Sequence, residues 1–82
     1  MTREEIIKIT NDFLIEEIEV EPDAVTEDAS FKDDLGIDSL DFVDIVVIVE
    51  KKFGFKIKAE EMVGVTTLGG FYDYIEKKVN KQ

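Results

Sequence analysis

Apolar residues recur three or four positions apart in three separate segments of the chain, which is the spacing that gives an α-helix one hydrophobic face. The pattern predicts helices over residues 3–18, 38–53 and 68–79, and one short helical turn over 59–63. We expect the hydrophobic faces to meet in a single core. The sequence therefore predicts an all-α fold, a small bundle of three principal helices and one short helix.

Residues suited to capping stand at the start of each predicted helix. Thr2 and Glu5 have the spacing of a capping box at the first helix. Asp38 can accept hydrogen bonds from the first-turn N–H groups of the second helix, and Thr67 can do so in the third. The valines within residues 46–49 favour a strand by propensity alone, but the cap and the apolar spacing outweigh that preference.

The connection between the first two helices is long but contains apolar residues that can hold it against the bundle. Pro22 cannot continue a helix. Ser30 is suited to cap a single short turn that ends at Gly36, a residue type that tolerates left-handed backbone. We therefore predict a packed loop, with these apolar contacts: Val20, Ala24, Val25 and Phe31.

The composition limits the classes of partner. The chain has 82 residues, so we expect one domain, residues 1–82. It has no segment long and apolar enough to span a membrane and no signal-peptide pattern, so we expect the protein to lie in the cytoplasm. Its net charge of −10 argues against nucleic acid and favours proteins with basic patches. Within residues 27–50, eight acids and one base give a local charge of −7, whereas bases gather in 51–58 and 77–81.

One serine lies between two acids where the second helix should begin, in the segment Asp34-Leu35-Gly36-Ile37-Asp38-Ser39-Leu40-Asp41. The chain has no His and no Cys, which excludes Ser-His and Cys-His catalytic triads. Ser39 is therefore better suited to covalent attachment than to catalysis. At the first helical position its hydroxyl lies beside the positive end of the helix dipole, where an attached phosphodiester is favoured.

This segment, with Phe31 before it and Phe53 at the helix end, resembles the attachment motif of acyl carrier proteins, and the resemblance covers nearly all of the chain. It implies that Ser39 carries a 4′-phosphopantetheine arm, transferred from coenzyme A by a phosphopantetheinyl transferase with Mg²⁺. The thiol of that arm would hold acyl intermediates of fatty acid biosynthesis as thioesters. The chain itself would be a non-catalytic carrier, acting as a monomer, with no metal site of its own.

The resemblance also implies two surfaces around Ser39. Acids and exposed apolar residues of the second helix would meet transferases, acyltransferases, ketosynthases and other acyl-processing enzymes with basic patches, through Asp38, Leu40, Asp41, Asp44, Val47, Ile48 and Glu50. An apolar pocket in the bundle would shelter the acyl chain, lined by Ile45, Val49, Ile57, Val65, Phe71 and Ile75. The inward face of the second helix is predicted to consist of Phe42, Ile45, Val46, Val49 and Phe53.

Some positions depart from the family pattern. Lys51 and Lys52 stand where acids are usual, and Phe42 and Phe71 stand where smaller residues are common. These departures leave open a carrier that serves a polyketide, aminoacyl or other specialised pathway. A calcium buffer is a further alternative, but no segment has the ligand spacing of an EF-hand loop. An enzyme would have to work with carboxylates alone.

Overall fold

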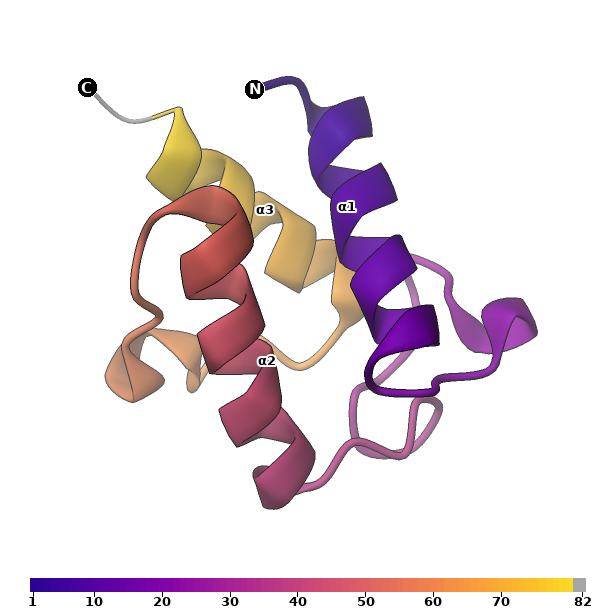
Figure 1. The fold of residues 1–82 in the computed structure, drawn as a ribbon. Helices are drawn as coiled ribbons and strands as arrows, with labels where there is room; N and C mark the ends of the chain where they lie inside the picture. The colour runs from indigo at the N-terminus through magenta and orange to yellow at the C-terminus, as the bar shows by residue number, and fades with distance from the viewer. Residues whose placement is uncertain (81–82) are drawn as a thin grey trace.

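The computed structural model describes residues 1–80 and shows three α-helices, α1 (Arg3–Glu16), α2 (Ser39–Phe53) and α3 (Leu68–Val79). Two short 3₁₀ turns lie between them, η1 (Pro22–Ala24) and η2 (Ala59–Met62) (Figure 1). The described residues contain no β-strand, and an isolated bridge joins Ser30 to Thr67. The predicted all-α fold is confirmed. Residues 81–82, which the predicted domain and the C-terminal basic group include, lie outside the described residues.

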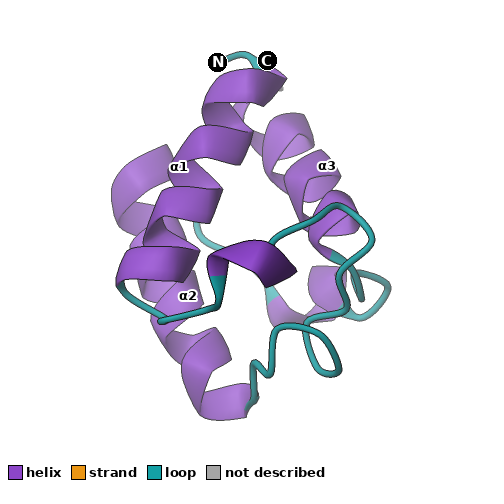
Figure 2. Cartoon of the chain, turned by 90° about the vertical axis from the view of Figure 1, so that its right-hand side faces the viewer, coloured by secondary structure: helices purple, strands orange, loops and turns teal. Residues whose placement is uncertain are grey.

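The helices are arranged so that α2 begins at the end of the molecule opposite the two chain termini (Figures 1 and 2). Helices α1 and α3 pack against each other. Arg3 on α1 strengthens this contact, because its guanidinium lies 2.6 Å from Asp73 and 3.0 Å from Glu76 on α3, and 3.1 Å from Glu27 in the connecting loop. These three acids, Asp73 foremost, raise the pKa of Arg3 above its ordinary value.

The helix starts follow the predicted caps. The Glu5 N–H donates to Thr2 Oγ1 at 3.2 Å and the Thr2 N–H donates to Glu5 Oε1 at 2.9 Å, which completes a capping box. Thr67 Oγ1 accepts from the Gly70 N–H at 3.2 Å. Because these bonds join residues only three positions apart, local sequence was sufficient to predict them.

Helix α1 ends at Glu16, two residues before the predicted end at Ile18. The Ile18 N–H donates to the carbonyl of Phe13, five residues back, so the helical hydrogen-bond ladder stops there. Glu19 then takes a positive φ of 65°, which reverses the chain direction. A non-glycine residue in this region of backbone space is uncommon, and no sequence signal indicated it.

The long connection is a packed loop, as predicted. Ser30 Oγ accepts from the Asp33 N–H at 3.2 Å, and the Ser30 N–H donates to Asp34 Oδ2 at 2.8 Å, so each end of the turn caps the other. Gly36 has the expected left-handed φ of 66°. The loop also lies close to the start of α3. The approach is so close that a Cβ added to Gly69 would lie only 3.0 Å from the carbonyl oxygen of Glu27.

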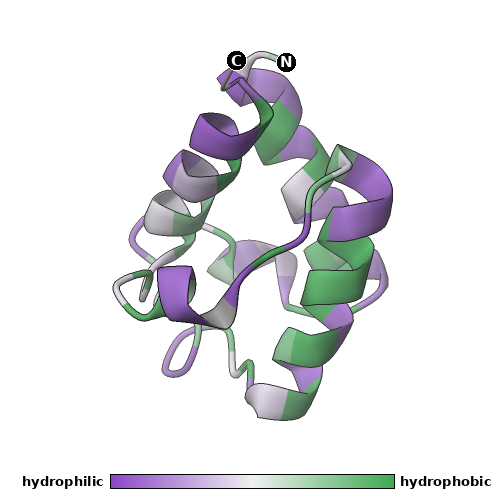
Figure 3. Ribbon diagram, turned by 90° about the vertical axis from the view of Figure 1, so that its left-hand side faces the viewer, coloured by the Kyte–Doolittle hydropathy of each residue, from purple (hydrophilic) through white to green (hydrophobic). Residues whose placement is uncertain are grey.

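The core face of α2 is close to the prediction. Ile45 and Val49 are fully buried, and the other three predicted residues, Phe42, Val46 and Phe53, are half-buried against the core. The middle turns of α2 are hydrophobic over much of their circumference (Figure 3). Because α2 has more apolar residues than its core face holds, one of them, Val43, lies on the outer side and is 60% exposed.

Candidate functional site

Ser39 is the first residue of α2 and its side chain is exposed. Asp38 precedes it as the N-cap, with Oδ1 accepting the backbone N–H of Asp41 at 3.0 Å. The carbonyl of Asp38 accepts the N–H of Phe42 at 3.0 Å, which starts the helical ladder. The cap thus fixes the backbone on both sides of Ser39 and leaves the serine hydroxyl free to face solvent.

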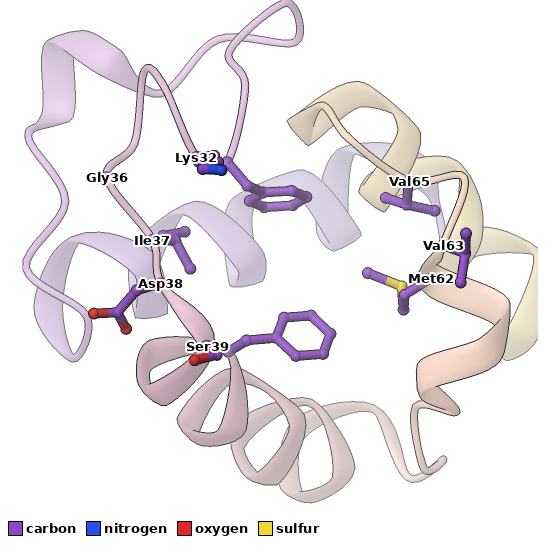
Figure 4. A pocket seen from close by; sticks show the side chains of 10 residues that line it. Lys32, Gly36, Ile37, Asp38, Ser39, Met62, Val63 and Val65 are labelled. Carbon is purple, nitrogen blue, oxygen red and sulfur yellow. The ribbon is translucent and has the colours of Figure 1, made fainter.

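An open cavity of about 590 Å³ lies beside Ser39. One side is formed by the loop before α2 and the first turn of α2, and the other by the segment from Met62 to Val65 (Figure 4). Polar groups stand at Lys32, Asp38 and Ser39, and Gly36 adds a short stretch of backbone. The remaining lining is apolar: Phe31, Ile37, Phe42, Met62, Val63 and Val65.

This geometry suits a serine that carries a long phosphodiester-linked arm. The phosphate would lie at the helix N-terminus, where backbone N–H groups and the helix dipole favour negative charge. Lys32 is an exposed cation among the residues that line the same cavity. The apolar walls beyond Ser39 could take up a hydrophobic group at the far end of such an arm. The residues present therefore fit the attachment of a phosphopantetheine group.

Most of the residues predicted to meet partners lie on the exposed side of α2. Asp38, Asp44 and Glu50 are exposed, and Leu40 and Val47 are 77% and 45% exposed. Asp41, in the first turn of α2, is only half-exposed. The partner role of these side chains stays a prediction.

Ile48 departs from its predicted exposed position. It is half-buried and packs against the core, and together with Ile18 it lines a shallow groove between the end of α1 and α2. The physical reason is that the end of α1, at Glu17 and Ile18, lies beside this part of α2. Sequence reasoning missed two exposed apolar residues near the site, Val43 and the 81% exposed Val63. Val43 falls between Leu40 and Val47 at helical spacing, which was a usable signal.

The residues predicted to line the acyl pocket are not brought together around the open cavity. Val65 lines it, whereas the other five, Ile45, Val49, Ile57, Phe71 and Ile75, are buried and form part of the core. Phe31, Phe42 and Met62 line the cavity in their place. The reason is that the core is filled by its own side chains, so the open volume lies nearer the surface, beside the start of α2.

The described residues show no group of three or more acidic, His or Cys side chains arranged to hold a metal ion. None of the helices in the described part of the chain is long and apolar enough to cross a membrane. The acids near Ser39 therefore lie dispersed along α2 and its preceding loop.

Comparison with known proteins assigns the class of this fold and site. The sequence pattern of the family described as "Phosphopantetheine attachment site" matches residues 12–75. The chain is 41% identical over 78 residues to the acyl carrier protein of Thermotoga maritima, covering 95% of this chain and 96% of that protein. It is 45% identical over 76 residues to the acyl carrier protein of Rhodococcus erythropolis, covering 93% and 84%.

A similar match is found with the meromycolate extension acyl carrier protein of Mycolicibacterium smegmatis, which is 45% identical over 76 residues, covering 93% of this chain and 77% of that protein.

The chain belongs to the phosphopantetheine-attachment family of acyl carrier proteins. Its function is that of an acyl carrier, and its cofactor is 4′-phosphopantetheine. Members of this family are generally carriers without catalysis of their own, and they work with a phosphopantetheinyl transferase and acyl-processing enzymes.

Proposed function

We propose that Ser39 is the residue that bears the phosphopantetheine arm, and that the protein serves fatty acid biosynthesis as a monomeric, non-catalytic carrier in the cytoplasm. The observation that carries this proposal is the position of Ser39, exposed at the first residue of α2 and at the wall of an apolar cavity. The chain has one other serine, Ser30, whose Oγ is already engaged with the Asp33 N–H in a turn.

In the attachment step the Ser39 oxygen forms a bond to the phosphorus of the coenzyme A pyrophosphate that bears the pantetheine. The bond from that phosphorus to the bridging oxygen breaks, and adenosine bisphosphate leaves. The proton of the hydroxyl passes to a base that the transferase supplies, because the carboxylate of Asp38, which also lines the cavity, already accepts the Asp41 N–H as the helix cap. This chain contributes an accessible hydroxyl and a rigid helix start.

After loading, the arm supplies a thiol that holds the acyl group as a thioester. The contribution of the chain is then to place that thioester before successive enzymes. The exposed acids and apolar residues along α2, with Asp44 and Leu40 as examples, offer charge and contact area to enzymes with basic patches around their active sites. The same helix thus anchors the arm and presents the docking surface.

The test is the mass of the protein after incubation with coenzyme A, Mg²⁺ and a phosphopantetheinyl transferase. The unmodified chain should gain one phosphopantetheinyl group. Ser39→Ala should gain none, while the matched control Ser30→Ala should gain one. Modification that persists in Ser39→Ala, or that is lost only in Ser30→Ala, would overturn the assignment of Ser39.

A further inference from the structure

One wall of the cavity beside Ser39 is an aromatic ring that is backed by a second ring in the core. Phe31 lines the cavity and is half-buried, whereas Phe71 on α3 is fully buried and does not line it. The two ring centroids lie 5.4 Å apart with the planes at 83°, an edge-to-face contact that favours both rings. Phe71 therefore stands behind Phe31 and supports it from the core side.

Beyond this pair the interior is closed. Leu68 and Ile75, the core residues that flank Phe71 on α3, are fully buried, and Val49 on α2 is equally inaccessible. None of these three side chains lines the cavity. Protein cores are packed to the density of organic crystals, so a chain that reaches Phe31 meets side chains and not open volume.

The opposite wall of the cavity is held in place from outside. Tyr74 on α3 donates a hydrogen bond to Glu61 at 2.7 Å, and the ammonium of Lys78 lies 2.9 Å from the same carboxylate. These contacts, that with Tyr74 foremost, hold the pKa of Glu61 below its ordinary value. Because Glu61 precedes Met62, they tie the wall formed by Met62 and Val63 to α3.

We propose that Phe31, supported by Phe71, sets the length of acyl chain that this carrier can shelter, and that its sheltered cargo is a short or medium-length apolar acyl group. This inference rests on the proposed attachment at Ser39. The first carbons of the acyl chain displace water from the walls formed by Phe42, Met62 and Val65. Met62 adapts to their shape because its side chain is long and flexible. Carbons beyond Phe31 remain in water.

The experiment uses the full chain loaded at Ser39 by a phosphopantetheinyl transferase from a series of acyl-coenzyme A donors, from acetyl through octanoyl to palmitoyl. The melting temperature should rise with chain length over the shorter acyl groups and then stay level through palmitoyl. Phe71→Leu removes part of the support behind Phe31, so in this variant the melting temperature should continue to rise to a longer acyl chain before it levels off. Phe13→Leu is the matched control, because Phe13 is a buried core residue of α1 outside the cavity, and it should leave the preferred length unchanged.

A steady rise to palmitoyl in the unmutated protein would overturn the proposal, as would an equal shift in Phe71→Leu and Phe13→Leu. If Phe71→Leu does not fold, fluorine NMR on terminally fluorinated acyl groups in the unmutated protein decides the question. The fluorine of a short chain should be shielded from solvent and that of a long chain exposed, and shielding at both lengths would refute a closed end. Failure to gain any acyl arm would instead refute the attachment at Ser39, and the mass of each sample separates the two cases.

Discussion

The carboxylate of Asp38 accepts the backbone N–H of Asp41 at 3.0 Å and so caps the helix that begins with Ser39. Replacing an aspartate N-cap by alanine costs about 1 kcal/mol, whereas asparagine caps about as well. We expect Asp38→Ala to lower the free energy of unfolding by about 1 kcal/mol and Asp38→Asn to lower it less, as measured by urea denaturation. Equal losses in the two variants would show that Asp38 acts through its charge and not through the cap.

Partner binding should depend on the charges of α2. Asp44 is exposed on α2, and Glu4 is exposed at the start of α1, at the opposite end of the molecule from the start of α2 (Figure 1). Reversal of either acid to Lys changes the net charge equally. Asp44→Lys should weaken binding to the transferase several-fold more than Glu4→Lys, because attraction between exposed charges falls off within about 10 Å at moderate salt.

Titration of the transferase with each variant at low and at moderate salt measures both effects. Binding of the unmutated protein should weaken as salt is added. Equal losses for Asp44→Lys and Glu4→Lys would assign the effect to overall charge. If added salt leaves the binding of the unmutated protein to the transferase unchanged, the binding does not depend on the charges of α2.

Salt should also stabilise the folded chain. The net charge is −10 on 82 residues, and the acidic side chains repel one another more strongly in the compact state than in the unfolded one. Because the described residues hold no cluster of metal-binding side chains, screening alone is expected to act. Sodium chloride and choline chloride should therefore raise the melting temperature alike, by a few degrees, which corresponds to roughly 1 kcal/mol. A rise with one cation only would indicate specific binding and contradict this account.

The sequence was sufficient wherever structure depends on residues a few positions apart. The caps at Thr2, Asp38 and Thr67, and the left-handed Gly36, are of this kind. The start of α2, and with it the exposed position of Ser39, follows from such local signals. The carrier family could be recognised for the same reason, since its motif occupies one short segment.

The sequence was insufficient where distant segments meet. The cavity joins Phe31 in the loop before α2 to Met62 and Val65 after it, and no periodicity predicts that contact. The predicted pocket was placed among core residues, but Phe71 and its neighbours are buried and fill that space, so the open volume lies elsewhere. The half-burial of Ile48 likewise depends on a contact between distant segments, because the end of α1 at Ile18 lies beside it.

Tyr72 predicts how the fold responds to alkaline pH. Its ring is buried in the core, its hydroxyl donates to Asn11 Oδ1, and burial raises its pKa to about 12. An unfolded tyrosine ionises near pH 10, as roughly expected for a solvated phenol. Between these two values the unfolded chain loses the phenolic proton while the folded chain keeps it. The contribution of Tyr72 to stability is therefore present below about pH 10 and is lost as the pH rises toward about 12.

Urea denaturation at several alkaline pH values tests this, with Tyr72→Phe as the matched variant. Tyr72→Phe also removes the hydrogen bond to Asn11, so the dependence on pH is compared and not the absolute stability. The free energy of unfolding should fall more steeply with rising pH in the unmutated protein than in Tyr72→Phe. The other ionisable side chains are the same in both proteins, so their contributions cancel in the comparison. Parallel declines would mean that the Tyr72 hydroxyl ionises as readily in the folded chain as in the unfolded one.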